Sequence, residues 1–186
     1  MEGSPHKTSS TSAIKPPGMN LGTTIIKGRR SVRAFRDTEI PEEAIRDALE
    51  CARQAPTAMN GQPWLIGVIR EKETLERIAG LTDHGKHIAG ARACFAIFGE
   101  KKAKYYLEDC CCATMNLILG LWAYGIGTCW VAGDKKPYAG AVRELLGVPD
   151  SYTLVSLVPA GYPSDMTIPP NKDLSAVSFS ERFVAR

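Results

Sequence analysis

The sequence predicts one domain in which a central β-sheet is covered by α-helices, and three observations support this prediction. The chain has 186 residues, which is long enough for a single domain with its own hydrophobic core. Hydrophobic residues make up 44% of it and charged residues 23%, as in ordinary globular proteins. Short apolar runs, which are typical of buried strands, alternate with segments of helical periodicity, and this alternation favours a sheet with helices packed on it.

The first expected helix covers residues 41–54. Pro41 suits its first position, because a proline there loses no backbone hydrogen bond. Pro56 ends the helix, because a proline cannot continue the backbone ladder. Between them, apolar side chains recur every three or four positions and give the helix one buried face: Ile45, Ala48, Leu49 and Ala52.

The same criteria place the remaining elements. Strands are expected at residues 64–69, 93–98, 128–132, 152–160 and 175–179, and helices at residues 72–79, 104–124 and 138–146. Residues 1–20 are rich in Ser, Thr, Pro, Lys and Gly, which predicts a disordered tail. The folded domain is therefore expected over residues 21–186.

The helix expected at residues 104–124 is apolar nearly all round, so we expect it to be buried on most sides, in the core or between subunits. It contains Glu108, Asp109 and Asn116, and Gly125 follows it as a natural end. Its uncharged part is shorter than the roughly 20 apolar residues that cross a bilayer. The sequence therefore argues against a membrane span.

The charge and the cysteines indicate a cytoplasmic protein without a nucleic-acid partner. A net charge of +3 is too mild to indicate nucleic acid. Cys110, Cys111 and Cys112 are consecutive inside a helical run, and consecutive helical side chains point in different directions and cannot bridge one another. No apolar signal segment opens the sequence. We expect reduced, buried cysteines.

A basic segment near the N-terminus suits a phosphate group. Arg29, Arg30 and Arg33 supply planar guanidinium groups that match phosphate oxygens, and Ser31 adds a short donor. The alternative interpretation is a solvated basic turn.

A second segment, residues 55–64, is a polar loop that leads into an apolar strand. Pro56 and Pro63 restrict its backbone, and short polar side chains lie between them. Such amides and hydroxyls suit ribityl hydroxyls or the polar edge of a heterocycle: Thr57, Asn60 and Gln62. An ordinary helix-to-strand connection is the alternative.

A third segment, residues 125–133, is rich in glycine. It has no lysine of a phosphate-binding P-loop, and its Gly-x-Gly follows a helix instead of a strand, so neither standard glycine motif applies. Ala132 and Gly133 remain able to bring backbone N–H groups near a ligand. The alternative is a helix cap followed by a strand.

Other functional classes find no support in the sequence. His6, His84 and His87 accompany six cysteines, but no Cys-x-x-Cys pair exists, so no metal site is expected. No Gly-x-Ser-x-Gly elbow and no cysteine with a poised base are present. The three tryptophans are expected in the core, not as a platform for stacking nucleic-acid bases: Trp64, Trp122 and Trp130.

The order and spacing of these segments resemble the FMN-dependent nitroreductase family. The matching motifs are Arg-Arg-Ser-Val-Arg at 29–33, Ala-Pro-Thr-Ala-Met-Asn-Gly-Gln-Pro-Trp at 55–64, Gly-Ile-Gly-Thr-Cys-Trp-Val-Ala-Gly at 125–133, Pro-Ala-Gly-Tyr-Pro at 159–163 and Pro-Pro-Asn-Lys at 169–172. The resemblance runs from about Thr23 to Phe183. It implies an α+β fold with a central, mostly antiparallel sheet flanked by helices. It also implies an intertwined homodimer with FMN at the interface and residues 104–124 as the dimer element.

The resemblance also implies roles for individual residues. Arg29, Ser31 and Lys172 would bind the phosphate with Arg30 nearby, and Arg33 would lie toward the pyrimidine edge of the flavin or help to bind the phosphate. A loop of the neighbouring subunit would reach the flavin through Pro56, Thr57, Ala58, Asn60 and Gln62. The ring would be lined, with a backbone N–H near its reactive nitrogen, by Trp130, Val131, Ala132 and Gly133.

Two departures from the family pattern affect the pocket. Family members often carry an acidic residue where Ala132 stands. Larger members also have an insertion after the strand that ends here at Phe98, so the pocket is expected to be more open.

The implied activity is ping-pong redox chemistry, in which NADH or NADPH gives a hydride to FMN and a nitroaromatic, a quinone or a similar acceptor removes it. Positive charge near the pyrimidine edge would favour the anionic reduced flavin. No catalytic acid or base is expected from the protein. Two alternatives remain. One is a flavin enzyme of the same fold that does not use NAD(P)H, of the dehalogenase, flavin-degrading or azoline dehydrogenase type. The other is a non-catalytic module that binds nucleotides or RNA phosphates.

Overall fold

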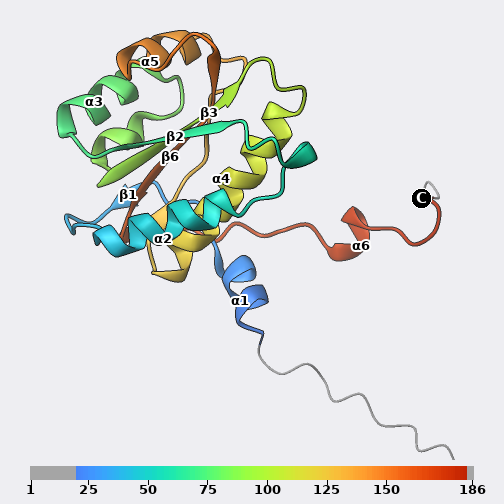
Figure 1. Ribbon diagram of the computed structural model, residues 1–186. Helices are drawn as coiled ribbons and strands as arrows, with labels where there is room; N and C mark the ends of the chain where they lie inside the picture. The colour runs from blue at the N-terminus through green and yellow to red at the C-terminus, as the bar shows by residue number, and fades with distance from the viewer. Residues whose placement is uncertain (1–19, 184–186) are drawn as a thin grey trace, which may run out of the picture.

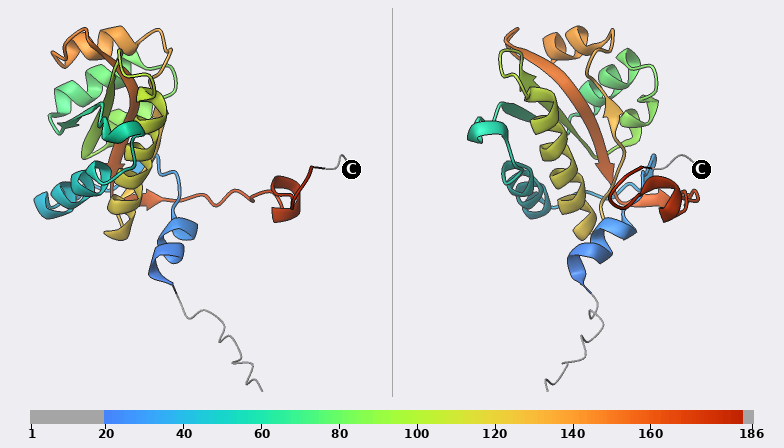
Figure 2. Two further views of the ribbon diagram at one scale, coloured as in Figure 1. Left: turned by 45° about the vertical axis from the view of Figure 1, so that its right-hand side comes forward. Right: turned by 90° about the vertical axis from the view of Figure 1, so that its right-hand side faces the viewer.

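The computed structural model describes residues 20–183 of the chain (Figure 1). The tail expected at residues 1–20 lies almost wholly outside the described residues and stays a prediction. The chain folds around one antiparallel sheet of five strands, as the implied α+β fold requires. Helices lie on both faces of the sheet (Figure 2).

The sheet has β3 (Ala93–Glu100) and β6 (Tyr152–Gly161) at its centre. On one side β3 pairs with the edge strand β2 (Trp64–Ile69). On the other side β6 pairs with two short strands, β4 (Gly127–Thr128) and β5 (Val131–Ala132). The predicted strands at residues 64–69, 93–98 and 152–160 are therefore confirmed.

Successive side chains of β3 point to opposite faces and so belong to two different hydrophobic layers. Phe95 and Ile97 pack with α2 (Glu42–Arg53) and α4 (Tyr106–Ala123). Ala96 and Phe98 pack with α3 (Lys72–Leu81) and α5 (Ala139–Leu145). All four side chains are fully buried, so the core lies on both sides of the sheet.

The expected helices are present with small shifts at their ends. Pro41 lies just before α2 as its N-cap and not inside the helix. Gly125, with φ +73°, follows the end of α4, and this left-handed backbone is the conformation that glycine adopts without strain. Helix α4 buries one face against the sheet, while Cys112 and Met115 are exposed.

The strand expected at residues 128–132 is interrupted after Thr128. Both short strands keep the same register with β6, since Thr128 pairs with Ala160 and Val131 with Leu157. Between them Cys129 N donates to Pro159 O at 3.3 Å. Proline has no N–H to return a hydrogen bond, so the ladder is broken there.

The prediction of a strand at residues 175–179 is wrong. The structure has a short helix there, α6 (Leu174–Val177), within a segment that lies away from the domain (Figures 1 and 2). We call residues 166–183 the C-terminal arm, and all of them are exposed. A strand needs a neighbour for its backbone hydrogen bonds, and the described part of this chain provides none beside the arm.

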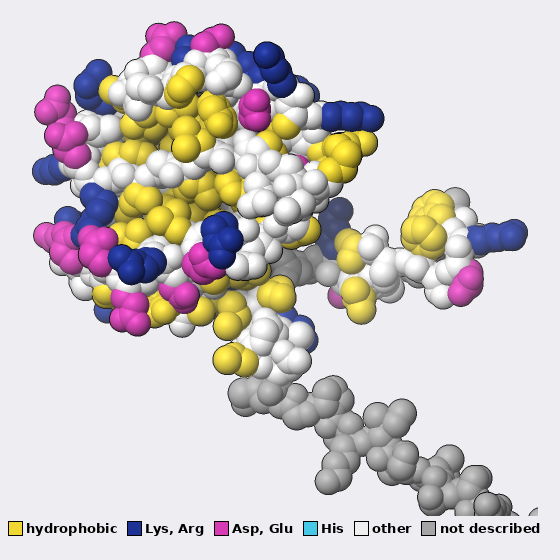
Figure 3. All heavy atoms as spheres, in the orientation of Figure 1, with side chains coloured by type: hydrophobic (Ala, Val, Ile, Leu, Met, Phe, Trp, Pro, Cys, Tyr) yellow, Lys and Arg dark blue, Asp and Glu magenta, His cyan; other side chains and the backbone are white. Residues whose placement is uncertain are grey.

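The arm leaves the domain from β7 (Pro163–Asp165), which pairs with β1 (Ala34–Phe35). A helix that the sequence did not predict, α1 (Leu21–Gly28), also has no buried residue. Hydrophobic side chains are visible on the surface of the arm and of the domain (Figure 3). Those of the arm are Met166, Ile168, Leu174, Val177, Phe179 and Phe183.

All six cysteines are free thiols. Burial raises the pKa of Cys94 to about 12, and burial also raises that of Cys110 to about 12. Cys129 is likewise buried, whereas Cys112 is exposed. The expectation of buried cysteines is therefore wrong for Cys112, because it lies on the side of α4 that faces away from the sheet.

Candidate functional site

The structure brings the first and third predicted segments side by side. Val32 N donates a hydrogen bond to Thr128 O at 2.8 Å, and Ser31 forms a parallel bridge with Thr128. This contact depends on Gly127, where a Cβ would lie 2.5 Å from Val32 Cγ2. The basic segment is thereby held against the chain that leads to Trp130.

The arginines of the basic segment differ in their contacts. Arg30 Nη1 donates to the carbonyl oxygens of Lys27 and Arg29, both at 2.7 Å, so its guanidinium group is used locally. Within residues 20–183, no side-chain hydrogen bond or ion pair involves Arg29 or Arg33. Their two guanidinium groups remain available to an anion.

Arg29 and Arg33 also lie near Cys129. Burial raises the pKa of the Cys129 thiol, and the positive charges of Arg33 and Arg29 partly offset this rise. The two arginines and the turn between β4 and β5 thus form one electropositive region.

A cavity of about 180 Å³ lies beside this region. It joins Arg33 to three residues expected to line the ring, Trp130, Val131 and Ala132. Sequence reasoning missed the other side chains around it, and the two histidines were considered only as zinc ligands. Together with Cys129 these additional residues are Asp83, His84, His87, Lys136 and Tyr138.

The backbone of β5 presents one N–H donor, that of Ala132, on the side away from β6. Gly133 N donates to Val155 O at 2.9 Å, so this N–H is already used. In an antiparallel pair only alternate residues bond to the same neighbour, so the N–H of Ala132 points away from β6. The carbonyl oxygen of Ala132, on that same outer side, accepts a hydrogen bond from Tyr138 Oη.

Gly133 was expected to bring a backbone N–H near a ligand, but the structure gives it a packing role. A Cβ at this position would lie 2.6 Å from Leu154 Cγ. The residue therefore allows close packing of the chain on β6 and does not offer a free N–H.

The second predicted segment forms a compact loop at the start of β2. It contains the 3-10 turn η1 (Ala58–Asn60), and Met59, Asn60 and Gln62 have φ values of 52°, 56° and 46°. Such left-handed backbone is strained for residues other than glycine. Gln62 Nε2 donates to Asn60 Oδ1 at 3.1 Å, which helps to hold the loop.

This loop is anchored to α4 and not to the basic segment. Ala58 N donates to Asp109 Oδ1 at 3.1 Å, and Asp109 is buried. Pro56 is exposed and Thr57 half-buried. No hydrogen bond within the described residues joins residues 56–62 to residues 29–33 or 128–133.

Lys172 is also separate from the phosphate-binding residues expected with it. It lies exposed on the C-terminal arm, before α6. No hydrogen bond or ion pair of the described chain joins it to Arg29 or Ser31.

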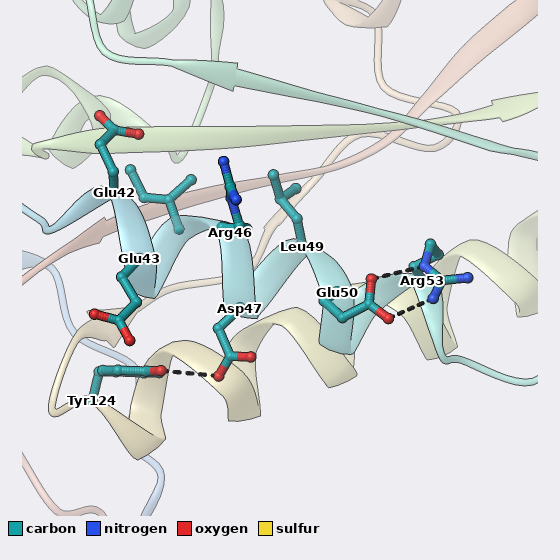
Figure 4. A pocket seen from close by; sticks show the side chains of 9 residues that line it. Glu42, Glu43, Arg46, Asp47, Leu49, Glu50, Arg53 and Tyr124 are labelled. Carbon is teal, nitrogen blue, oxygen red and sulfur yellow. Dashed lines mark hydrogen bonds and ion pairs between the residues drawn. The ribbon is translucent and has the colours of Figure 1, made fainter.

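A larger groove of about 970 Å³ runs along α2 and contains none of the predicted residues. Two interactions join side chains of this groove (Figure 4). Arg53 forms an ion pair with Glu50, and Tyr124 Oη donates to Asp47 Oδ2 at 3.0 Å. Acidic side chains outnumber basic ones around the groove, which does not suit a phosphate group.

Within residues 20–183, no group of three potential metal-binding side chains lies together. None of the helices in this part of the chain is both long and apolar enough to cross a bilayer.

The chain is similar to known proteins over most of its length. The model of the family described as Nitroreductase family matches residues 26–85 and 81–162. A candidate NADH dehydrogenase/NAD(P)H nitroreductase of Archaeoglobus fulgidus is 34% identical over 147 residues, which cover 76% of this chain and 84% of that protein. An iodotyrosine deiodinase of Thermotoga neapolitana is 29% identical over 172 residues, or 79% of this chain and 91% of the relative.

A solved structure extends the comparison to the fold. A candidate nitroreductase of Desulfovibrio desulfuricans, in complex with FMN, superposes with a TM-score of 0.79 and 25% identity. The match covers 90% of this chain and all of the other.

Proposed function

The chain belongs to the nitroreductase family, and from this premise we propose that it is an FMN-dependent oxidoreductase. It takes a hydride from NADH or NADPH and passes it to a nitroaromatic, a quinone or a similar acceptor. The observation that best supports this proposal is the contact between the basic segment and the chain at Thr128, which the 2.8 Å hydrogen bond from Val32 N maintains.

The residues present suit the phosphate end of FMN. Arg29 and Ser31 lie at the end of α1 next to β4, and the guanidinium group of Arg29 has no partner within residues 20–183. A planar guanidinium group binds phosphate oxygens through two parallel hydrogen bonds. Arg30 adds positive charge nearby. Lys172 joins these residues at the phosphate once the C-terminal arm that carries it packs against the site.

The residues of the small cavity suit the ring end. Arg33 shares this cavity with Trp130, Val131 and Ala132, which favours the pyrimidine edge over the phosphate as its contact. When bound, FMN supplies the hydride chemistry. Arg33 stabilises negative charge on the ring, and the N–H of Ala132 offers a fixed hydrogen-bond donor near it.

We also propose that the active form is a homodimer. Six large apolar side chains of the arm are 47–77% exposed in the single chain, and apolar side chains in such number mark an interaction surface. The polar loop at residues 56–62 lies apart from the basic segment of its own chain. A second copy brings the two together if its loop, held by Asp109, reaches across the interface.

A cytoplasmic location is part of the proposal. Free thiols at all six cysteines are typical of proteins in reducing compartments.

A second candidate function is reductive dehalogenation without direct use of NAD(P)H. The iodotyrosine deiodinase that covers 79% of this chain favours it. Both candidates use FMN, and the readiness with which a nicotinamide reduces the bound flavin distinguishes them.

The visible spectrum of freshly purified protein tests both candidates. A yellow protein that bleaches rapidly when NADH or NADPH is added under nitrogen supports the reductase. Stable oxidised flavin in excess nicotinamide contradicts it and favours the dehalogenase. Colourless protein that stays colourless after addition of FMN, and binds RNA with steep salt dependence, contradicts both.

A further inference from the structure

The small cavity beside Trp130 and Ala132 is bordered by the imidazole of His87. His87 lies in the 3-10 turn η2 (Lys86–Gly90), just before β3. Its Nε2 atom is buried and has no hydrogen-bond partner in the described structure. Buried polar atoms are almost always paired, so this nitrogen is expected to meet a ligand.

The imidazole is held in its neutral form. Burial lowers the pKa of His87, and the positive charge of Arg33 lowers it further. At neutral pH His87 therefore presents one ring nitrogen as a donor and the other as an acceptor. A proton added to it would stand beside the guanidinium group of Arg33, which opposes that proton as long as no negative charge is near.

The other charged groups of the cavity leave Arg33 without a counter-ion. Lys136 Nζ lies 3.1 Å from Asp83 Oδ2, and this ion pair neutralises both. The hydrogen bond from Lys136 is the main reason why the pKa of Asp83 is lowered. The cavity thus has one net positive charge, from Arg33, and attracts a ligand that is or becomes negative.

The remaining titratable groups of the cavity do not supply that negative charge. Burial raises the pKa of Tyr138, whose hydroxyl donates to Ala132 O, and burial also raises the pKa of Cys129. Both side chains are therefore uncharged at neutral pH. His84 is exposed.

We propose that His87 contacts the bound flavin ring and takes up one proton when the ring gains negative charge on reduction. The inference rests on the proposed function, since it needs a ligand whose charge changes during turnover. His87 is thereby a positioning and charge-balancing residue and not a group that transfers the hydride.

The electrons and protons balance in both half-reactions. A nicotinamide hydride brings two electrons and one proton to the flavin, which then carries one more negative charge. His87 Nε2 takes one proton from solvent, so the total charge of the cavity is unchanged. When the acceptor removes the hydride, the flavin loses that negative charge and His87 returns its proton to solvent.

NMR of the imidazole nitrogens in FMN-loaded protein tests this proposal directly. The sequence has only three histidines, and the signal that is lost in His87→Gln identifies His87. In oxidised protein we expect His87 to titrate below the usual value of about 6.5 for imidazole. In photoreduced protein we expect about a tenfold or larger gain in its proton affinity, because the nearby negative charge favours imidazolium.

A count of protons taken up per two electrons, made with an indicator dye at pH 7, provides the second readout. Glutamine keeps a hydrogen-bonding amide but cannot titrate, so His87→Gln should take up fewer protons than the natural protein. Lys102→Gln is the control, because Lys102 is exposed and lies outside the cavity, so the same loss of a titratable side chain there should leave the proton count unaltered.

The outcomes separate this inference from the proposed function. Bound FMN with the same His87 titration in both redox states overturns the inference and leaves the oxidoreductase intact. An unchanged proton count in His87→Gln overturns it as well. Failure of the purified protein to bind FMN overturns the proposed function, and the inference with it.

Discussion

Arg29 and Arg33 each present a guanidinium group that no residue between 20 and 183 neutralises. If they bind FMN, Arg29→Ala and Arg33→Ala should each remove charge-assisted hydrogen bonds of about 1.5–3 kcal/mol. This corresponds to a rise in the dissociation constant of roughly 10- to 100-fold, measurable by quenching of flavin fluorescence.

Arg36→Ala is the control for this loss of charge. Arg36 is exposed, and its side chain forms no ion pair or hydrogen bond with the described residues. An equal loss of FMN affinity in all three variants would show a general charge effect and contradict the specific site.

Gly127 allows the closest approach between the two site segments. An alanine Cβ there would lie 2.5 Å from Val32 Cγ2 and 3.0 Å from Pro163 Cγ. Gly127→Ala should lower the free energy of unfolding by about 1–3 kcal/mol, as overpacking does in cores. Urea denaturation measures this change.

Gly140→Ala provides the matched comparison, because a Cβ at Gly140 meets nothing within 4 Å. Gly140 lies inside α5, where alanine is favoured over glycine by roughly 0.5–1 kcal/mol. Destabilisation of similar size in both variants would rule out the close contact as the cause.

The residue types of the site were predictable, but their neighbours were not. The sequence shows that Arg29 and Arg33 suit a phosphate or a polar ring edge, since charge and hydrogen-bonding capacity belong to the side chain. It does not show that Arg33 shares a cavity with His87 and Lys136, because those contacts arise only when η2 and the chain before α5 fold onto β5. His87 was visible in the sequence but was considered there only as a metal ligand.

At the scale of single elements, Asp109 in the first turn of α4 fixes the polar loop. Its carboxylate accepts the hydrogen bond from Ala58 N, next to a backbone with three left-handed residues. Asp109→Ala leaves that N–H without its partner, at a cost of about 1–3 kcal/mol, and should weaken FMN binding by loosening the loop.

Two other variants show whether the loop is the cause. Asp109→Asn keeps an oxygen acceptor and should restore most of the FMN affinity. Thr114→Val removes a buried hydroxyl of the same helix, which lies 2.9 Å from Ser156 Oγ, and should lower stability without changing FMN affinity. Equal FMN affinity in Asp109→Ala and the natural protein would refute the anchoring role.

Elements were predictable where their own residues determine them. Apolar runs correctly indicated β2, β3 and β6, whose side chains face a core on one or both sides. The break between β4 and β5 depends on Pro159, which lies on the neighbouring strand, so the sequence of residues 128–132 alone does not show it. The strand expected at residues 175–179 failed for a related reason, because a strand also requires a partner.

At the scale of the whole molecule, the C-terminal arm is the feature that one chain leaves unexplained. Ile168 is 69% and Phe179 67% exposed. If the arm packs on a second copy, Ile168→Ser combined with Phe179→Ser should convert a dimer into monomers in analytical ultracentrifugation, because apolar contact area drives association.

Ser175→Ala, on the same arm, is the control and should leave the dimer intact. A natural protein that sediments as a monomer at micromolar concentration would contradict the homodimer before any variant is made.

If FMN binds between two copies of the chain as proposed, each chain contributes the arginines of one cofactor pocket and the polar loop of the other. Two different defects then need not lie in the same pocket. A chain with Arg29→Ala and a chain with Asp109→Ala, each poor in flavin by itself, should complement one another after subunit exchange. Every mixed pair would regain one intact pocket, and yellow colour would return to half of the pockets in those pairs.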